Sequence, residues 1–554
     1  STQGVSSAAS DVYKRQIKGD EARTELYKGL KTVSDVVAQT SGPGGRTIAI
    51  QQSWGTPKVT KDGVTVAKSI TLMDAEGEGA KLIVQASEKT NRDAGDGTTA
   101  TCIIASAIAE EGLKWISKGR KSTEIQQGIN IAVKDVVEVL KSHSKKVETN
   151  EEIRQLATIS ANGDAEIGDF IAKAIEIVGE RGVVTVEEAK GLKTELEVVD
   201  GLQFDQGYLS PYFMTNAERQ LVEYDNPLIL LYDGKINTIQ SILPLLEDVM
   251  QIGQPLVLIS DEMADEPLST LVINRMKAGL KVCAVKAPSF GDIRKFQMED
   301  IAILTGGEFI STQMGYKLED VKVESLGSCD KIRISPTETV IIGGHGDKNA
   351  VSERAEQLIA EIENTESSYD KEKLRERLAK LTKGVAVIKV GGATETEVKE
   401  KKDRVEDAVC ATRAALEEGI LPGGGVSLVR AYQEISNNLD FAITDDEWTG
   451  YGIVLNSLSA PMKKIAENAG KTGEVIVEKV QDNETYSYGY DARNDKFCDL
   501  IEAGILDATK VVRCALENGA SIAGSLLTVE GLIIDDTETN LKLMSAMKPS
   551  QMGM

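Results

Sequence analysis

The chain is short of histidine, of aromatic residues and of positive charge. Its 554 residues include only 2 histidines, and aromatic residues make up 4%. The 87 acidic residues outnumber the 63 basic residues and give a formal net charge of −24. This charge opposes nonspecific binding to nucleic acids or anionic membranes, which are themselves polyanions. The scarcity of aromatic residues also disfavours a base-stacking platform for single-stranded nucleic acid.

Several kinds of chemistry lack the residues that they need. His143 and His345 stand in unrelated sequence contexts, so neither a Ser-His-Asp triad nor a multi-histidine metal site is expected. The 6 cysteines are scattered without CxxC spacing, which disfavours a zinc or redox motif and is typical of a reducing compartment. No apolar run approaches the ~20 residues that span a bilayer. Any chemistry should therefore use carboxylates, hydroxyls, lysines and the backbone.

The two ends of the chain differ from the rest. The first sixteen residues, STQGVSSAASDVYKRQ, are small and polar and lack the apolar core of a secretory signal. Their composition favours a sequence-assembly remnant, with a degraded organelle-targeting peptide as the alternative. We expect residues 1–16 and 533–554 to be disordered tails. The absence of an export signal favours the bacterial cytoplasm, with the mitochondrial matrix as the alternative.

Two helical regions enclose a middle region of mixed character. Residues 18–142 and the residues after Gly392 carry apolar side chains at spacings of three and four. Between about 180 and 390, short β-branched runs alternate with helical patterns, which predicts an α/β region. Glycine-rich turns occur in both outer regions, at 41–46, 94–99, 421–426 and 487–493. One ligand site could use all four turns only if the two ends fold together around an inserted middle.

One of these turns carries a charged residue. The segment NRDAGDGTTAT (91–101) places Asp96 between two glycines, with Thr98 and Thr99 directly before an apolar helical pattern. The N-terminus of a helix favours anions, and Asp96 could bind Mg²⁺ together with phosphate oxygens. The same residues could also do no more than cap the helix. Spacing alone leaves both interpretations open.

Other motifs are weaker by themselves. SGPGGR (41–46) and KDGVTVA (61–67) are ordinary turns. Asp407 stands two residues from Val405 in a helical pattern, so it points away from the apolar stripe of that helix, as a solvated acid would. AENAGKTGE (466–474) resembles a P-loop but follows a helical pattern and lacks the first glycine of that motif, so an ordinary P-loop ATPase is not expected.

Two helical patterns in the middle region carry apolar stripes. Such stripes are usually buried core, but an exposed pair would form a groove for apolar segments of another chain. The first stripe consists of Ile239, Leu243, Leu246 and Met250, and the second of Leu268, Val272 and Met276.

Eight short segments occur in a fixed order along the chain. They are GPGGR, TKDGVTVA, AGDGTTAT, FDQGYLSPYF, VKAPSFGD, KEKKDRVEDA, PGGGV and GILDATKV. Together they resemble the group I chaperonins, the GroEL family, from about Ile17 to Asp535. The resemblance implies a mixed α and β, multidomain fold. Its implied parts are a discontinuous helical equatorial domain (17–142 and 418–532), a small intermediate hinge domain (143–199 and 386–417) and an inserted α/β apical domain (200–385).

The resemblance also implies a function. The protein would be an ATP-dependent molecular chaperone, with a chaperonin ATPase that uses ATP, Mg²⁺ and K⁺. Its partners would be non-native polypeptides, copies of itself in seven-membered rings stacked in pairs, and a heptameric co-chaperonin lid. Two alternatives are a chaperonin-like scaffold with reduced folding activity and an ATP-dependent phosphotransferase. The second would need an acceptor site that no motif indicates.

Individual site residues follow from the same resemblance. Asp407 and Asp62 would be the catalytic carboxylates, with Asp407 orienting the attacking water, and Asp96 would be the magnesium ligand. The implied nucleotide-binding residues are Thr40, Ser41, Gly42, Pro43, Lys61, Asp96, Gly97, Thr98, Thr99, Ala100, Gly424, Asp491, Ala492, Arg493 and Asp507. The implied apolar surface for substrate and lid consists of Tyr208, Tyr212, Phe213, Leu243, Leu246, Leu268, Val272 and Ile273.

Some residues depart from the pattern of the family. Ala100 stands where a third threonine is usual, which removes a hydroxyl near the phosphates, and Asp491 stands where many members have asparagine. Gln206 replaces an arginine and removes an expected ion pair with Glu395. Lys146 replaces a proline that is common at the lower hinge. These departures leave the strength of cooperativity open.

Overall fold

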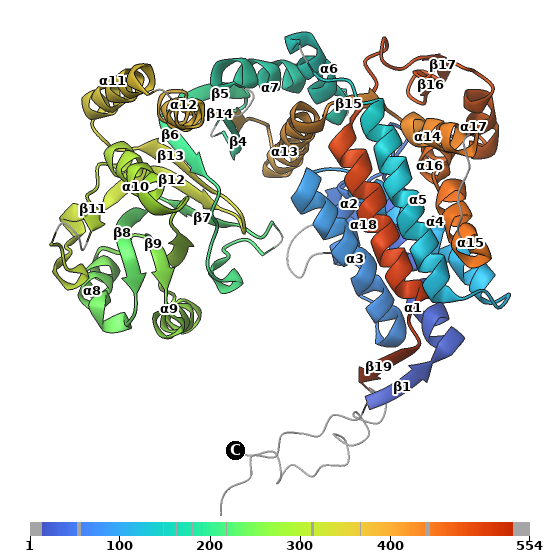
Figure 1. Cartoon of the computed structure of the whole chain (residues 1–554), viewed down its shortest axis with the longest axis horizontal. Coiled ribbons are helices and arrows are strands. Elements are labelled where there is room, and N and C mark those ends of the chain that lie inside the picture. Colours follow the sequence, from blue (N-terminus) through green and yellow to red (C-terminus); the bar gives the residue numbers. More distant parts are fainter. Residues whose placement is uncertain are drawn as a thin grey trace, which may run out of the picture. The chain divides into compact units, whose positions relative to one another are not determined.

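The computed structural model describes residues 14–535 apart from 52–56, 148, 162, 180–181, 190, 218, 312–314, 366 and 438–443. The chain forms two compact units (Figure 1). The helical unit joins the chain up to Asp169 with the chain from Asp403 onward, and the α/β unit comprises Phe170–Lys402. The mixed, multidomain fold class with an inserted α/β part is therefore confirmed. The exact bounds of three separate domains stay a prediction.

The helical unit contains most of the helices. Its helices are α1 (Gly19–Ala38), α2 (Gly63–Ser69), α3 (Asp74–Ala94), α4 (Thr98–Ile116), α5 (Ser122–Ser142), α6 (Asn150–Ser160), α14 (Val426–Asn437), α15 (Asp445–Ser457), α16 (Ala460–Asn468), α17 (Gly473–Gln481) and α18 (Thr509–Leu527). Its strands are β1 (Lys14–Lys18), β2 (Ile48–Ile50), β3 (Lys58–Thr60), β15 (Ile420–Pro422), β16 (Tyr488–Asp491), β17 (Lys496–Asp499), β18 (Leu506–Ala508) and β19 (Gly531–Asp535). Helices α7 (Ala165–Val178) and α13 (Glu395–Glu418) cross the division between the units.

Glycines let the long helices of this unit approach closely. A side chain at Gly29 of α1 would collide with the backbone of α3, and one at Gly79 of α3 would collide with the backbone of α1. Leu26, Leu30 and Val33 of α1 are buried beside these contacts at spacings of three and four, as an amphipathic helix requires. The close α1–α3 crossing therefore depends on small residues on both helices.

Helix α18 ties the C-terminal part of the chain to the N-terminal part. It packs on α3, α4 and α5, and most of its side chains are buried. Strand β1 pairs antiparallel with β19, from Lys14 opposite Asp535 to Lys18 opposite Gly531. The predicted disordered tails, 1–16 and 533–554, are therefore too long, because residues 14–16 and 533–535 lie in these strands. The parts of the tails at 1–13 and 536–554 lie outside the described residues.

The α/β unit is built on a mixed sheet. Its strands are β4 (Val183–Glu188), β5 (Glu195–Val199), β6 (Gly201–Phe204), β7 (Val222–Asp225), β8 (Leu228–Ile236), β9 (Leu256–Met263), β10 (Val282–Lys286), β11 (Phe309–Ser311), β12 (Gly327–Ile334), β13 (Thr339–Gly344) and β14 (Val385–Val390). Its helices are α8 (Leu243–Ile252), α9 (Asp265–Ala278), α10 (Gly291–Thr305), α11 (Lys348–Asn364) and α12 (Ser368–Thr382), with short 3-10 turns η1 (Pro211–Phe213) and η2 (Ile239–Ser241).

The positions of the strands in the sheet explain why some of them are continuously apolar. The main sheet runs β10-β9-β8-β12-β13-β6, with β11 on β8 and β7 on β12. Strands β8, β9 and β10 are parallel and almost wholly buried, which is why they read as continuous apolar runs. A separate sheet, β4-β14-β5, carries β4 parallel and β5 antiparallel to β14.

A buried ion cluster joins the helices α10, α11 and α12. The Asp300 carboxylate accepts hydrogen bonds from Arg377 at 2.8 and 2.9 Å and from Arg354 at 2.9 Å. Asp300 and Arg377 are 3% and 6% exposed at their side chains, and the Arg377 guanidinium lies over the ring of Phe296. Every charge in this cluster has a partner of opposite sign.

No helix among the described residues is both long enough and apolar enough to cross a bilayer.

Candidate nucleotide site and apolar surface

The loop that carries Asp96 lies between α3 and α4. Gly95 and Gly97 both adopt left-handed backbone conformations, at φ 73° and 85°, which favour glycine. The Gly97 N–H donates to the Asp96 carboxylate at 2.5 Å, and Gly97 is the residue before the first turn of α4. Asp96 is therefore held at the N-terminus of a 19-residue helix, where the exposed N–H groups favour anions.

A second loop meets this helix N-terminus. Asp62 caps α2 by accepting hydrogen bonds from the backbone N–H groups of Val64 and Thr65 at 3.1 and 3.0 Å. The next residue, Gly63, comes so close to α4 that a Cβ there would lie 2.5 Å from Thr99 Oγ1 and 2.8 Å from Thr98 Oγ1. Gly63 is required for this approach. The two loops form one polar surface with the hydroxyls of Thr98 and Thr99.

The loop at 40–45 completes this side of the site. The Thr40 and Thr99 hydroxyls lie 3.3 Å apart, and the Gly45 N–H donates to the Gly42 carbonyl at 3.0 Å. Asn468, at the end of α16, donates to the carbonyls of Ala38 and Ser41, both at 2.9 Å. Sequence reasoning missed Asn468, because no motif connects residues so far apart along the chain.

The C-terminal part of the chain supplies the opposite side. Asp507 lies on β18 and accepts hydrogen bonds from the backbone N–H groups of Gly424 and Gly425. Both glycines have left-handed backbones, and the space above Gly424 is open. Burial and the nearby Asp96 carboxylate raise the pKa of Asp507 to about 7, although the two N–H groups lower it. An open backbone beside a carboxylate suits the hydroxyls of a sugar.

In the hairpin β16–β17, the carboxylate of Asp491 bonds to its own turn and is not directed at a ligand. The Asp491 carboxylate accepts hydrogen bonds from the Arg493 and Asn494 N–H groups at 3.0 and 3.1 Å and from the Asn494 amide at 2.7 Å. Asp491 is 4% exposed, so this carboxylate is used within the turn. The Arg493 side chain instead lies against Gly163, in the turn between α6 and α7. Contacts to a ligand from this loop would come from its backbone and from Ala492.

Helix α13 brings a third acid to the site. A Cβ at Gly95 would collide with Cys410, so α13 packs directly on the Asp96 loop one turn beyond Asp407. The pKa of Asp407 is raised well above its ordinary value, first by burial and then by the carboxylates of Asp62 and Asp96. Burial raises the pKa of Asp96 as well, and Asp62 adds to this effect. Asp407 is thus not the solvated acid that its position on the helix indicated.

These acids constitute an uncompensated negative site. A neighbouring carboxylate raises the pKa of each of Asp96, Asp407 and Asp507, and none of the groups that shift these three acids is a lysine or an arginine. No group of three or more His, Cys, Asp and Glu side chains among the described residues could hold a metal ion alone. A Mg²⁺ ion fits this donor set, because Mg²⁺ commonly takes one or two carboxylates and completes its shell with phosphate oxygens and water.

The remaining residues of the expected nucleotide site differ in their exposure and in their distance from the core. Ser41 and Gly42 lie in the loop held by Asn468, whereas Pro43 and Lys61 are exposed. Ala100 packs against the core of the helical unit. Ala100 is only partly buried there, so the effect of the missing threonine hydroxyl on phosphate binding stays a prediction.

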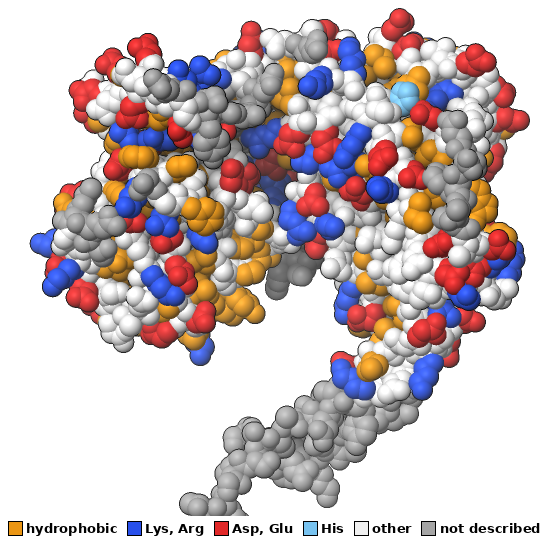
Figure 2. All heavy atoms as spheres, viewed as in Figure 1, with side chains coloured by type: hydrophobic (Ala, Val, Ile, Leu, Met, Phe, Trp, Pro, Cys, Tyr) orange, Lys and Arg blue, Asp and Glu red, His pale blue; other side chains and the backbone are white. Residues whose placement is uncertain are grey.

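The structure exposes part of the apolar surface that was expected on the α/β unit, and the role of that surface in binding stays a prediction. Helix α9 contacts η1 and η2, and α8 contacts η2, so the two stripes lie near each other. Tyr212, Leu243 and Ile273 are exposed at 63%, 44% and 51%. Tyr208, Leu268 and Val272 are partly buried against the core. Met250 and Met276, from the same stripes, are also exposed, and Figure 2 shows apolar side chains among charged ones on this unit.

Two expected members of this surface are wrong. Phe213 and Leu246 are 0% and 5% exposed and belong to the core of the α/β unit. On α8, Leu246 lies on the buried side together with Leu245 and Val249, because the buried stripe of this helix is wider than one residue. The exposed residues lie at the edges of that stripe.

The structure also brings together a serine, a histidine and an aspartate that the sequence did not connect. His345 Nδ1 lies 3.0 Å from Ser328 Oγ, and His345 Nε2 lies 2.9 Å from the Asp330 carboxylate. Strands β12 and β13 place these residues side by side. The side chains of His345 and Asp330 are 45% and 65% exposed, however. Water therefore competes with each hydrogen bond, and the arrangement lacks the desolvated setting of a catalytic triad.

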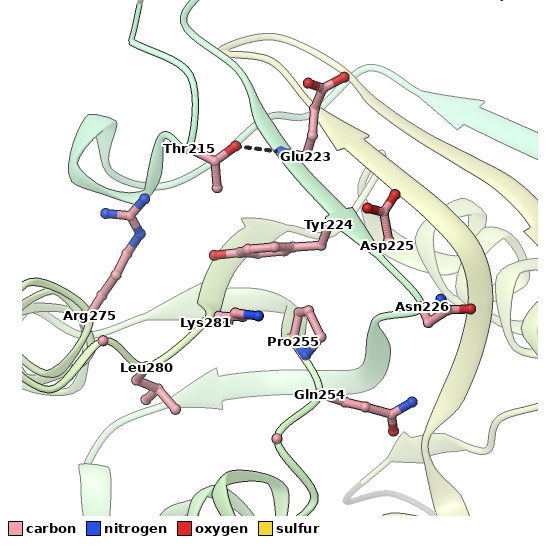
Figure 3. Close-up of a pocket in the computed structure, with 12 residues that line it drawn as sticks. Thr215, Glu223, Tyr224, Asp225, Asn226, Gln254, Pro255, Arg275, Leu280 and Lys281 are labelled. Atoms are coloured by element: carbon pink, nitrogen blue, oxygen red, sulfur yellow. Dashed lines mark hydrogen bonds between the residues drawn. The ribbon is translucent and has the colours of Figure 1, made fainter. Parts of the chain in front are cut away.

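A hollow of about 750 Å³ lies where β8, β9 and β10 begin (Figure 3). Arg275 and Lys281 line it together with Glu223 and Asp225. The Glu223 carboxylate accepts a hydrogen bond of 2.9 Å from Arg333. Arg333 does not line the hollow. This wide opening has charges of both signs and no convergent set of donors among the described residues, so it indicates no ligand class.

Comparisons with known proteins agree on one family. The family model described as the TCP-1/cpn60 chaperonin family matches residues 33–537. Among solved structures, the chain is similar to the chaperonin gp146 from the bacteriophage EL 2 (Pseudomonas aeruginosa), crystallised in the presence of ATP-BeFx. The TM-score is 0.66 at 22% identity, and the match covers 94% of this chain and 99% of gp146. This second likeness supports the fold.

Proposed function

Because the chain belongs to the TCP-1/cpn60 chaperonin family, we propose that it is an ATP-dependent chaperone that captures non-native polypeptides and encloses them in a ring of its own copies. One observation carries the ATP part of this proposal. Loops from both ends of the chain converge at the N-terminus of α4, where partly buried acids, whose pKa values neighbouring carboxylates raise, lie beside the backbone N–H groups of the helix N-terminus. The crystallisation of gp146 with ATP-BeFx is consistent with the same use of this fold.

We assign separate tasks to the residues of the site. Thr98, Thr99 and the N-terminus of α4 hold phosphate oxygens, and Asp96 holds Mg²⁺. When bound, Mg²⁺ neutralises charge on the phosphoryl group that is transferred. Asp407 orients the attacking water and accepts its proton, for which a raised pKa is suited. Asp62 supports the site mainly as the cap of α2, and Gly424 and Asp507 lie at the ribose. A K⁺ ion near the phosphates belongs to the same proposal.

The apolar residues at the surface of the α/β unit would bind clients. Unfolded chains expose apolar side chains, and burying each one against Tyr212, Leu243 or Ile273 contributes ~1.5–3 kcal/mol without sequence specificity. A co-chaperonin lid would compete for the same residues. ATP binding would favour the state in which the lid holds them, so that the client is released into the enclosed cavity.

Ring assembly is supported by two small sheets in the helical unit. Strands β1 and β19 form a two-stranded sheet, and β2 and β3 form another. Each has outer edges without a partner strand among the described residues, and such edges are templates for pairing. Two-stranded sheets are also only marginally stable alone. We propose that the β2–β3 hairpin of one subunit extends the β1–β19 sheet of the next, in seven-membered rings.

A chaperonin-like scaffold with reduced folding activity is the second candidate. It would keep the rings and the fold but would not need the uncompensated acids. Electron microscopy of the purified protein tests assembly, and suppression of client aggregation with and without ATP tests chaperone activity. Rings that bind clients but do not hydrolyse ATP would favour the scaffold. A protein without rings would contradict the assembly proposal.

The metal assignment has its own test. Asp96→Lys should abolish Mg-ATP binding, because it removes the ligand and places a cation in its position. Asp93→Lys makes the same charge change at an exposed position three residues earlier and should leave binding unchanged. Nucleotide titration by calorimetry measures both. Unchanged affinity in Asp96→Lys would mean that the loop only caps a helix.

A further inference from the structure

Three buried polar side chains lie directly beneath the Asp96 loop. Thr101 Oγ1 lies 2.9 Å from Thr90 Oγ1 and 3.0 Å from the Gly97 carbonyl. The Asn518 amide donates to Thr90 Oγ1 at 3.0 Å. Thr90 and Thr101 are 0% exposed and Asn518 is 5% exposed. These three side chains therefore depend on one another, because water does not reach them.

The hydrogen bonds have a consistent direction. The Thr90 hydroxyl donates to the Ala86 carbonyl one turn earlier, at 3.1 Å. Its oxygen is then free to accept from the Asn518 amide and from the Thr101 hydroxyl. The single Thr101 proton is shared between Thr90 and the Gly97 carbonyl. The chain of bonds runs from α18 through α3 to α4, and ends on the loop itself.

The loop has few other means of being held in place. Gly95 and Gly97 have no side chains and both adopt left-handed backbones, so neither anchors the loop by placing a side chain in the core. Gly97 approaches Val511 on α18 closely, and Cys410 of α13 touches Gly95. The chain of hydrogen bonds between buried side chains reaches the loop through Thr101, whose hydroxyl donates to the Gly97 carbonyl.

We infer that Thr90, Thr101 and Asn518 are positioning residues that set the place of Asp96 relative to the phosphate-binding N-terminus of α4. This inference rests on the proposed nucleotide function. It also divides the threonines of the loop: the hydroxyls of Thr98 and Thr99 lie beside Gly63, whereas Thr101 faces Thr90. Asn518 lies on α18 and exerts its role through Thr90.

The test removes the hydroxyl or the amide without changing shape. Thr101→Val and Asn518→Leu each break the chain of bonds on a different helix, and Thr101→Ser keeps the hydroxyl. Thr305→Val is the matched control, since Thr305 is a buried threonine of the α/β unit whose hydroxyl donates to the Ile301 carbonyl at 2.8 Å. The rate of ATP hydrolysis is measured against Mg²⁺ concentration, and hydrogen exchange of residues 91–101 is measured without nucleotide.

We expect Thr101→Val and Asn518→Leu to weaken the apparent Mg²⁺ affinity by about 10- to 100-fold, as loss of groups that orient a metal ligand commonly does. Both should speed exchange in the loop. Thr101→Ser should recover most of the loss, and Thr305→Val should show neither effect. A merely structural role would lower stability in all the valine variants but would not move the Mg²⁺ dependence.

Two results would overturn the inference. One is an unchanged Mg²⁺ dependence in both Thr101→Val and Asn518→Leu while the wild-type protein hydrolyses ATP. The other is unchanged exchange at residues 91–101 in both variants, which can be measured even if no ATP hydrolysis exists. If the wild-type protein does not hydrolyse ATP, the proposed function fails for that reason, and the exchange experiment still decides whether the three residues hold the loop.

Discussion

Acids that are removed from water, wholly or in part, have opposite kinds of neighbours in the two units. In the α/β unit, Asp300 is enclosed by Arg354 and Arg377, and each of its oxygens accepts from a guanidinium. In the helical unit, neighbouring carboxylates raise the pKa of both Asp96 and Asp407, and no cation is among the groups that shift them. A buried ion cluster that is complete serves the structure. Like charges that the fold leaves close together oppose folding, and such sets are typical of functional sites.

The same contrast separates the apolar residues of the α/β unit. Phe213 and Leu246 are enclosed by the core, whereas Tyr212 and Leu243, each next to or near them in sequence, remain at the surface. Isolated exposed apolar residues are ordinary, but several on two neighbouring helices indicate binding. Uncompensated acids and uncovered apolar side chains therefore lie in different units, which is what a chaperone driven by a nucleotide requires.

The largest expected effect is on Asp407. Asp407→Ala should lower ATP turnover by about 10²–10⁴, because it removes the group proposed to orient and deprotonate water, while ATP binding should persist. Single-turnover hydrolysis and a binding titration measure the two properties. Glu417→Ala, at an exposed position of the same helix where the acid pairs with Lys510, should leave turnover unchanged. Full hydrolysis by Asp407→Ala would remove Asp407 from the mechanism.

Asp300 should respond in stability and not in turnover. Asp300→Ala leaves Arg377 and Arg354 without their shared carboxylate, and breaking a buried ion pair costs about 3–5 kcal/mol of unfolding free energy. Its neighbour Glu299, which also contacts Arg354 but is 35% exposed, should cost less than about 1 kcal/mol when changed to alanine. Denaturant unfolding compares the two variants. Equal losses would mean that the cluster at Asp300 is no more important than a surface pair.

Leu246 and Leu243 offer a comparison within one helix. Leu246→Ala should destabilise the protein by about 2–5 kcal/mol, since it leaves a cavity in the core. Leu243→Ala should change stability by about 0.5 kcal/mol or less and should instead weaken capture of unfolded polypeptides. Thermal unfolding and an aggregation assay measure both properties. If Leu243→Ala leaves capture intact, this exposed residue does not belong to the binding surface.

Ordered motifs made the fold and most of the nucleotide loops predictable. The turns at 41–46, 94–99 and 421–426 contain glycines, and the close approaches at Gly63 and Gly95 require them. Glycine is therefore informative wherever two backbones nearly touch. The resemblance to the chaperonin family that these motifs carry implied that the two outer regions of the chain form one unit, as the structure shows.

The remaining features depend on which residues meet in space. Asn468, Thr90 and Asn518 lie on ordinary helical patterns, and each acts on a loop or helix that the local sequence does not indicate. Helical periodicity also could not distinguish Leu246 from Leu243, because both fall on one stripe and only their burial against the core separates them. Pairing of residues 14–16 with 533–535 was likewise invisible, since β1 is short and mostly polar and its partner strand lies at the other end of the chain.

The smallest expected effect tests whether the uncompensated acids destabilise the fold. The pKa of Asp507 is raised to about 7 by burial and by Asp96, above the ~3.9 of an unfolded chain. The folded protein then binds more protons than the unfolded chain between about pH 4 and 7, so the free energy of unfolding falls as the pH rises through that range.

The side chain introduced by Asp507→Asn does not titrate, and its amide oxygen can still accept hydrogen bonds from the N–H groups of Gly424 and Gly425. Asp507→Asn should therefore raise the melting temperature of the nucleotide-free protein by a few degrees at pH 8, given ~2–4 °C per kcal/mol for a large domain, and by less at pH 5. Equal shifts at both pH values would show that Asp507 is ionised throughout, and that water entering above Gly424 screens it from Asp96.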